Sequence, residues 1–439
     1  SARASAGWLA GAAMRGLGRS GVAEKVRRAA AARVAEGLGQ LKGLAMKLGQ
    51  VLSFAVEDLP PELQDALQAL QTSSPPRPFE DIAPVIERAL RRPLSEAFAR
   101  IDPAPVAAAS IGQVHRAILD DGRAVAVKVQ YPDVAAAVRA DVANLSVLVR
   151  SVRLLAPRID AELVAREVRE RFLDELDYVA EARHQAAFAA RFEGHPFISV
   201  PRVIASHSAA EVLTSEWVDG LRFQEALGGA EDVRSRQGEI LFRFVYGCVF
   251  GWGTFDGDPH PGNYLFDRDG SRVTFLDFGC VKRLPEPVLR GWRSFVGALL
   301  DRDRAASREH ALRLGFVEAG PEAGIDGVVA ALTRLYLPFG QDGPQRFPSL
   351  WKSVSPADIL GGELGDVRRR LRVPGDLVFV NRTLAGMYMV LSRLGATASW
   401  GRIAREYVSG APPSTPLGAA EQAWARERRP GEGSPANHR

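Results

Sequence analysis

Residues 258–263 are Asp-Pro-His-Pro-Gly-Asn, and residues 277–279 are Asp-Phe-Gly. Proline and glycine predict a loop for the first stretch, so that the side chains of Asp258 and Asn263 can both turn toward one cleft. Asp277 follows an apolar segment, and a carboxylate at the end of a strand suits a metal ligand. Each stretch alone is also what an ordinary turn contains. Their order across a predicted hairpin makes the pair specific.

A lysine interrupts an apolar segment nearer the N-terminus. Residues 124–129 are Ala-Val-Ala-Val-Lys-Val, and the alternation of a strand places Ala126 and Lys128 on one side and the valines on the other. An ammonium group buried there is costly unless anions accept it, and phosphates would do so. The alternative is a lysine on an edge strand that keeps its water, and this stretch alone does not decide between the two.

Along the sequence the three stretches follow one another as 124–129, 258–263 and 277–279, which is the order of the corresponding parts in a protein kinase. Together they supply what phosphoryl transfer from a nucleotide requires. Lys128 offers positive charge for phosphates, Asn263 and Asp277 offer ligands for Mg²⁺, and Asp258 offers a polar group near the attacking oxygen. The spacing of Asp258 and Asn263 equals the Asp-x₄-Asn spacing of the protein-kinase catalytic loop. We therefore expect a phosphate and Mg²⁺ site built around these residues.

The order of the predicted elements indicates an α+β, protein-kinase-like fold with two lobes. A small strand-rich N-lobe is followed by a larger helical C-lobe, and a helical extension precedes both. Residues from Ala411 onward are rich in Pro, Gly, Ser and charge, which predicts disorder. The predicted parts are the extension at 1–100, the N-lobe with inserted helices at 101–218, the C-lobe with the catalytic and metal loops at 219–410, and the disordered segment at 411–439.

The turn before the lysine strand differs from the usual phosphate-covering loop. Residues 107–115 are Ala-Ala-Ala-Ser-Ile-Gly-Gln-Val-His, where a protein kinase carries Gly-x-Gly-x-x-Gly. Alanine cannot take a positive φ cheaply, so this turn is not a flexible glycine flap. The candidate phosphate contacts in it are Ala107, Ala108 and Ala109, through nearby N–H groups, and Ser110.

With these motifs the chain resembles the UbiB/ADCK (AarF-domain) family of atypical kinases. Val-Ala-Val-Lys-Val-Gln-Tyr-Pro at 125–132, Leu-Asp-Phe-Gly at 276–279 and Lys-Leu-Gly-Gln at 47–50 belong to the same resemblance. It runs from about residue 35 to residue 285 and implies ATP and Mg²⁺ as cofactors. The implied activity is that of an atypical kinase or ATPase.

The resemblance also implies roles for individual residues. Lys128 would hold the α- and β-phosphates and pair with Glu181. The segment with Glu216 and Val218 would link the lobes, and its backbone would bind adenine. Asp258 would orient or deprotonate the acceptor, whether this is water or a lipid-like hydroxyl.

A regulatory lid is a further implication of the resemblance. Lys47 and Gln50 lie in the family's Lys-x-Gly-Gln signature, and Glu175 and Asp177 match its Glu-x-Asp motif. The two motifs would meet over the mouth of the nucleotide site and hinder the docking of a protein substrate. A solvated charged face is the alternative for the acidic helix, and the residues alone favour it.

The amino-acid composition limits the classes of partner that we expect for this chain. The formal net charge is only +4, which argues against a nucleic-acid binder, but residues 1–42 carry eight basic side chains against two acidic ones. That segment is either a solvated basic helix or a helix on an anionic membrane surface. Two cysteines and the lack of a long apolar run indicate a cytoplasmic protein, with peripheral contact at the inner face of a membrane as the further expectation.

The preferred hypothesis is an Mg²⁺-dependent ATPase or phosphotransferase that supports isoprenoid-quinone or related lipid metabolism at a membrane surface. Its expected partners are a nucleotide, a lipid or quinone precursor, and enzymes of lipid metabolism. A nucleotide-binding pseudokinase scaffold for partner enzymes and a small-molecule phosphotransferase are the alternatives. The phosphate acceptor, the oligomeric state and the lipid binding of residues 1–30 are left open by the sequence.

Overall fold

The computed structural model describes residues 76–108, 111–143, 169, 173–339, 343–348, 367 and 370–428. These form two compact units. The first takes in the described residues up to Tyr178 together with Ala209–Leu213, and the second takes in Val179–Ser208 and the described residues from Thr214 onward. The sequence places the boundary between lobes after residue 218, whereas the units divide at Tyr178. The predictions for Lys47, Gln50, Ala109 and Ser110 lie outside the described residues.

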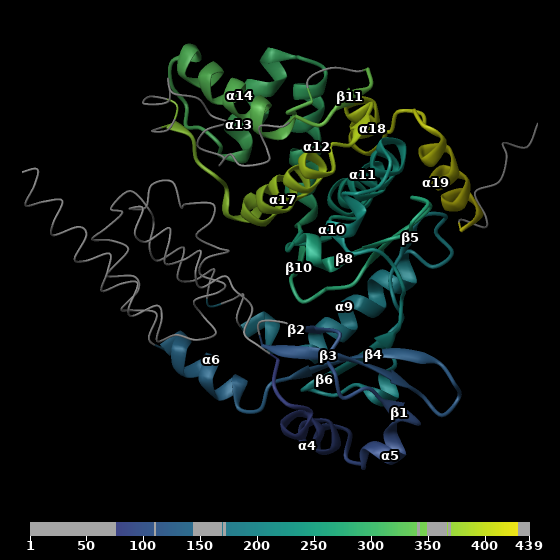
Figure 1. Ribbon diagram of the computed structural model, residues 1–439. Coiled ribbons are helices and arrows are strands. Elements are labelled where there is room, and N and C mark those ends of the chain that lie inside the picture. The colour runs from purple at the N-terminus through teal and green to yellow at the C-terminus, as the bar shows by residue number, and fades with distance from the viewer. Residues whose placement is uncertain are drawn as a thin grey trace, which may run out of the picture. The chain divides into compact units, whose positions relative to one another are not determined.

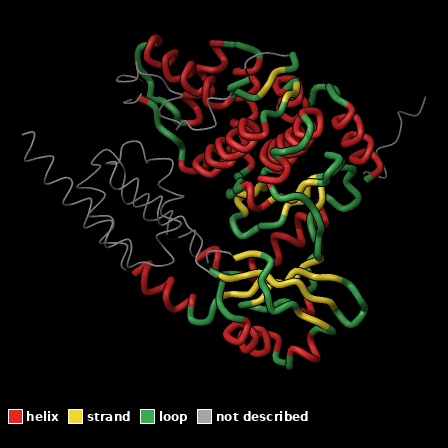
Figure 2. The backbone as a smooth tube through the Cα atoms, in the orientation of Figure 1, coloured by secondary structure: helices red, strands yellow, loops and turns green. Residues whose placement is uncertain are grey.

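The first unit is built on an antiparallel sheet, coloured as strands in Figure 2. The strand order is β1-β3-β4-β6, with β2 also paired to β3, and the labels are shown in Figure 1. The strands are β1 (Arg100–Ile101), β2 (Ala107–Ala108), β3 (Gly112–Ile118), β4 (Ala124–Gln130) and β6 (Val212–Glu216), of which β6 continues into the second unit. A hairpin around Gly122 joins β3 to β4, with Ile118 opposite Ala124.

Helices cover this sheet and extend from it. They are α4 (Phe79–Leu90), α5 (Leu94–Ala97) and α6 (Val134–Ala143). The first of them, α4, buries Ile82, Val85 and Ile86, which recur at helical spacing, and packs against β4. The valines of β4 are fully buried while Lys128 is only half-buried, so the predicted alternation of this strand is confirmed.

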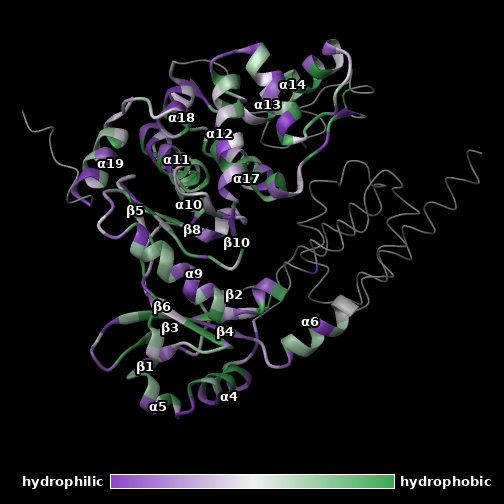
Figure 3. Ribbon diagram, turned by 180° about the vertical axis from the view of Figure 1, so that it is seen from behind, coloured by the Kyte–Doolittle hydropathy of each residue, from purple (hydrophilic) through white to green (hydrophobic). Residues whose placement is uncertain are grey.

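The second unit is mainly helical. Its helices are α9 (Tyr178–Arg191, whose first residue belongs to the first unit), α10 (Phe223–Ala226), α11 (Glu231–Tyr246), α12 (Glu286–Leu300), α13 (Arg304–Leu314), α14 (Glu322–Tyr336), α17 (Val378–Leu394), α18 (Trp400–Val408) and α19 (Pro416–Glu427). Polar and apolar stretches alternate along these helices, as Figure 3 shows, because one face of each turns to the core. The core includes Trp292, Tyr388 and Trp400. Within the described part of the chain, no helix is long and apolar enough to cross a membrane.

Short strands complete the second unit and carry the loops of interest. A three-stranded sheet has the order β5-β9-β8, and β7 pairs with β10. The strands are β5 (Ile198–Ser199), β7 (Thr254–Asp256), β8 (Tyr264–Phe266), β9 (Val273–Phe275) and β10 (Val281–Arg283); β11 (Gln345–Arg346) pairs separately with β12 (Thr397–Ala398). The predicted β8–β9 hairpin is confirmed, and Gly270 in its turn has a φ of 72°.

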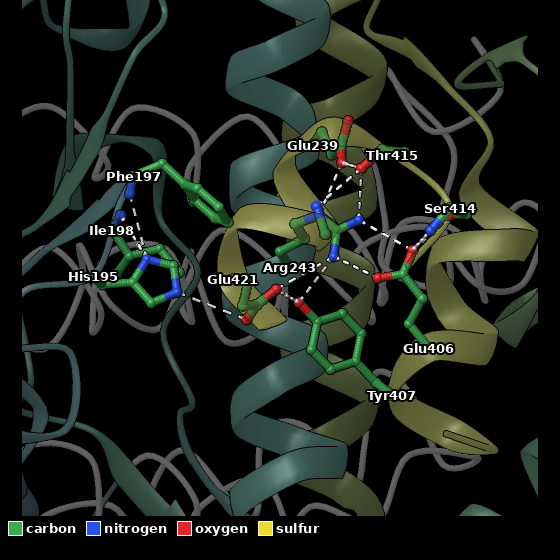
Figure 4. A network of polar contacts seen from close by, with 11 residues as sticks. His195, Phe197, Ile198, Glu239, Arg243, Glu406, Tyr407, Ser414, Thr415 and Glu421 are labelled. Carbon is green, nitrogen blue, oxygen red and sulfur yellow. Dashed lines mark hydrogen bonds and ion pairs between the residues drawn. The ribbon is translucent and has the colours of Figure 1, made fainter. Parts of the chain in front are cut away.

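The prediction of disorder from Ala411 is wrong for the residues of α19. This helix begins with Thr415, whose side chain accepts a hydrogen bond from the Gly418 N–H. It is held by a buried polar network, in which Glu421 and Thr415 bind Arg243 of α11 (Figure 4). Composition predicted disorder because a segment with little apolar surface has no core of its own. The partner that stabilises α19 lies far away in the sequence.

Candidate functional site

The loop at residues 258–263 is held by hydrogen bonds between its own residues and the end of β7. The Asp258 N–H donates to Asp256 Oδ1 at 2.9 Å, and Asn263 Nδ2 donates to the Asp258 carbonyl at 3.1 Å. His260 Nδ1 accepts from the Gly262 N–H. Because the amide nitrogen of Asn263 is engaged inside the loop, its Oδ1 atom is the one that can bind a cation.

The β8–β9 hairpin brings Asn263 and Asp277 to the same end of a pair of strands. Tyr264 lies opposite Phe275 in the register, and one step further the Leu276 N–H donates to the Asn263 carbonyl at 3.0 Å. Asp277 Oδ1 accepts from the Gly279 N–H at 2.9 Å, which fixes the turn of the Asp-Phe-Gly segment. The two residues that the sequence predicts as metal ligands therefore lie at the same end of the β8–β9 hairpin.

One face of α9 covers the Asp-Phe-Gly segment. A β-carbon built on Gly279 would lie 3.3 Å from Asp277 Oδ1 and 3.7 Å from Glu181 Oε2, so these two carboxylates flank the glycine. His184 Nδ1 lies 3.3 Å from the carbonyl oxygen of Phe278. Phe188 packs on the Phe278 ring, with centroids 4.6 Å apart. Glu181 is only 2% exposed.

Sequence analysis missed the helix that holds Asp258. Arg382 of α17 donates from Nη2 to Asp258 Oδ1 at 3.0 Å, and the two side chains are 9% and 26% exposed. The next residue, Thr383, donates from its hydroxyl to the carbonyl of Asp256 at 3.1 Å. The available signal was an arginine inside a mainly apolar helix, because such an arginine requires a partner when it is buried.

Three carboxyl groups influence one another around this loop. Burial raises the pKa of Asp256 well above its usual value, the charges of Asp258 and Asp277 raise it further, and Arg382 opposes them. Among the described residues, no group of three or more His, Cys, Asp or Glu is arranged to hold a metal ion. A cation here would take Asn263 and Asp277 as protein ligands and complete its shell with phosphate and water oxygens, as Mg²⁺ does in phosphoryl-transfer sites.

Lys128 lies in the first unit, on the half-buried face of β4. Val114 of β3 is opposite to it in the register. Its ammonium nitrogen lies 5.1 Å from the ring centroid of Tyr178, which is within the range of a cation–π contact. Ala107 and Ala108 form β2 next to β3, so the described part of the alanine-rich motif is a strand.

Three described residues at the end of this motif, Gly112, Gln113 and His115, have structural roles. Gln113 is fully buried, accepts the Arg77 N–H at 2.8 Å and donates to the Arg77 carbonyl at 3.2 Å. His115 Nδ1 lies 2.8 Å from the carbonyl of Asp102 and must donate to it, so its Nε2 accepts from the Gln113 amide. A β-carbon on Gly112 would lie 2.2 Å from the carbonyl oxygen of Val129, so this position requires glycine.

The remaining candidates occupy turns and strand ends. The Glu216 N–H donates to the Arg202 carbonyl at 2.9 Å at the end of β6, and Val218 follows in an irregular segment. Asp177 lies in the turn before α9. The candidate residues are divided between the two units. The first unit contains Lys128, Ala107, Ala108, Glu175 and Asp177, and the second contains Glu181, Glu216, Val218, Asp258, Asn263 and Asp277. The convergence of Lys128 with Asp277 and the pairing of the two lid motifs stay predictions.

Comparisons with known proteins agree with the motifs. A family model described as the ABC1 atypical kinase-like domain matches residues 69–311. The chain is 30% identical to the mitochondrial atypical kinase COQ8B of Rattus norvegicus, over 83% of this chain and 69% of that protein. It is 26% identical to the mitochondrial atypical kinase COQ8 of Saccharomyces cerevisiae, over 85% and 75% of the two chains.

A solved structure shares the fold. The complex of Rv3197 with erythromycin from Mycobacterium tuberculosis has a TM-score of 0.64 and 29% sequence identity, and the match covers 89% of this chain and 98% of that one. The predicted two-lobed, kinase-like α+β fold is thereby confirmed. The chain belongs to the ABC1 atypical kinase-like family, the UbiB/ADCK family that its motifs resemble.

Proposed function

We propose that this chain is an atypical kinase or ATPase that binds Mg-ATP. The observation that carries the proposal is the β8–β9 hairpin, which brings Asn263 and the Leu276–Asp277 segment to the same end of two paired strands, next to the loop that holds Asp258. An amide oxygen and a carboxylate are hard oxygen ligands, which fit Mg²⁺. When bound, the metal would neutralise charge on the β- and γ-phosphates.

Asp258 is the residue that would act on the acceptor. Its backbone N–H is anchored on Asp256 and one carboxylate oxygen is engaged by Arg382, so the side chain has a fixed direction. A carboxylate held in this way can accept a proton from a hydroxyl or a water that lies within hydrogen-bond reach. We propose water or a lipid-like hydroxyl as this acceptor.

Lys128 would bind the α- and β-phosphates and pair with Glu181. The ammonium group lies over Tyr178, the first residue of α9, and Glu181 is three residues further along that helix. Residues three apart share a helix face, which supports the pairing. In the remaining roles, Ala107, Ala108, Ala109 and Ser110 would line the phosphates, Glu216 and Val218 would bind adenine, and Lys47 and Gln50 would form a lid with Glu175 and Asp177.

The setting we propose is lipid metabolism at the inner face of a membrane. Relatives that cover most of this chain carry the name COQ8, which supports an isoprenoid-quinone or related lipid pathway. A quinone precursor, an anionic lipid surface and partner enzymes are the proposed partners. The basic residues 1–42 are the segment that would meet anionic lipid.

Phosphate release from ATP, measured with and without anionic liposomes, tests the enzyme against the scaffold. Turnover that requires Mg²⁺ and disappears in Asp258→Ala supports the enzyme. Tight Mg-ATP binding without turnover in any lipid or quinone-precursor condition would instead favour a nucleotide-binding scaffold. Transfer of the γ-phosphate to a small molecule in place of lipid or water would point to a small-molecule phosphotransferase.

A further inference from the structure

One face of α17 is devoted to the loop that carries Asp258. This face carries four residues at spacings of three, one and three positions, which places them on one side of the helix: Phe379, Arg382, Thr383 and Gly386. Each of the four approaches the segment of residues 256–259.

Two of these residues approach the loop by close packing. A β-carbon on Gly386 would lie 2.3 Å from Pro259 Cγ, so any other residue here would push the helix off the loop. Phe379 Cδ1 lies 3.4 Å from the position of a β-carbon on Gly257, in ordinary van der Waals contact. The distance between helix and loop is therefore fixed sterically.

The other two approach the loop by hydrogen bonds. Thr383 holds the Asp256 carbonyl at 3.1 Å, and Arg382 holds the Asp258 carboxylate at 3.0 Å. Because Arg382 is only 9% exposed, solvent weakens this ion pair much less than it weakens a surface pair. A guanidinium also stays charged at any physiological pH and donates through a rigid planar fork.

We propose that Arg382 is a positioning residue that holds the Asp258 carboxylate in the direction its reaction requires. The inference rests on the proposed function and adds to it a residue that acts on Asp258 and does not touch the nucleotide. Asp277 adds a second negative charge near the same loop, and its charge and that of Asp258 both act on Asp256. Without the guanidinium of Arg382, the Asp258 carboxylate would lose the donor that fixes its direction in the loop.

Steady-state kinetics of α17 variants test this role. In Arg382→Met the charge is lost, and we expect kcat to fall about 10²-fold, as for a reacting group displaced by about 1 Å. The KM for ATP and the thermal shift with Mg-ATP should change less than about twofold, because Asn263 and Asp277 remain in place. Arg382→Lys keeps the charge without the fork and should recover part of the loss.

Arg393 provides the matched control. It lies on the same helix, with its guanidinium 4.7 Å from the ring centroid of Phe223, away from the loop. Arg393→Met should therefore leave kcat unchanged. The inference is overturned if Arg382→Met lowers kcat no more than Arg393→Met does, or if it lowers kcat and the Mg-ATP thermal shift together.

A double-mutant cycle separates this inference from the proposed function. The melting temperatures of the wild type, Arg382→Met, Asp258→Asn and the double variant measure the pair without any turnover. We expect Asp258→Asn to raise the melting temperature of the Arg382→Met protein, since it removes the charge of a carboxylate that has lost its bond to Arg382. If the change in melting temperature of the double variant equals the sum of the changes in the two single variants, the two side chains are not coupled, and the inference is overturned even in an active enzyme. A coupled cycle in a wild type that neither hydrolyses ATP nor transfers its γ-phosphate refutes the proposed function alone.

Discussion

Replacement of Arg243 by methionine is the most severe single change that we predict for the fold. Arg243 is fully buried on α11 and donates to Glu239 and Glu406, each at 2.8 Å (Figure 4). It also binds Glu421 of α19 at 3.3 Å and Thr415 at 2.8 Å. Burial acts to lower the pKa of Arg243, but the hydrogen bond with Glu406 and the surrounding charges outweigh it and raise that pKa. The guanidinium thus neutralises a cluster of poorly solvated carboxylates.

The magnitude follows from what is left behind. Methionine fills much of the volume of the arginine stem, so the cost is mainly electrostatic, and removing one partner from a buried ion pair costs about 3–5 kcal/mol. Since domains unfold with about 5–15 kcal/mol, the loss is a large share of the total. We expect the free energy of unfolding to fall by about that amount, and α19 to detach first because two of its anchors are lost.

Urea unfolding followed by far-UV circular dichroism measures the loss, and hydrogen exchange of residues 416–427 reports on α19. Arg290→Met is the control, because the Arg290–Glu286 pair on α12 is more than 60% exposed on both sides. Exposed pairs of this kind contribute about 0.3–0.5 kcal/mol. A loss below about 1 kcal/mol for Arg243→Met, with exchange in α19 unchanged, would refute the electrostatic reasoning.

Three further predictions concern the site and the two units. Asp277→Asn should abolish the thermal stabilisation by Mg-ATP, which is about 2.7 kcal/mol at a nucleotide concentration of 100 Kd, and leave melting without nucleotide unchanged; a retained shift would count against Asp277 as a ligand. Gly112→Ala should destabilise the first unit by about 1–3 kcal/mol, because its methyl group would press on the Val129 carbonyl; urea titration measures this, and wild-type stability would contradict the close approach. Burial lowers the pKa of His115 and of His195 in the folded protein. Below about pH 6.5 these histidines therefore bind protons more readily in the unfolded chain than in the folded protein, and the free energy of unfolding should fall as the pH drops. Unfolding measured at pH 7.5 and pH 5.5 checks this, and a glutamine at either position should reduce the slope; a slope unaffected by both replacements would exclude these histidines as its source.

The sequence predicted the loops that carry the chemistry because their signals are local. Proline and glycine fix the loop at residues 258–263, and alternation fixes the side of β4 on which Lys128 lies. The hairpin that unites Asn263 with Asp277 has its turn residues and its strands within a short stretch. Such features need no knowledge of distant partners, and the fold class followed from their order.

Features that depend on distant partners were not predicted. Arg382 meets Asp258 across more than a hundred residues of sequence, and nothing near Arg382 indicates which carboxylate it binds. For the same reason composition predicts disorder where α19 forms, although Trp424 donates to the Glu193 carbonyl and packs on His195. In both cases a polar or charged side chain becomes favourable only after the fold has removed it from water and provided its partner.

Helix α9 joins these features to the site. Its first half carries Glu181 and His184 against the Asp-Phe-Gly segment, and its last residues approach α19, where Arg428 donates to the Ala190 carbonyl at 3.0 Å. Through Arg428 and Trp424, the C-terminal part of the chain is hydrogen-bonded to the end of α9 and to the residues that follow it. The segment for which composition predicts disorder thus contacts the helix that carries Glu181, the residue that the proposed function pairs with Lys128.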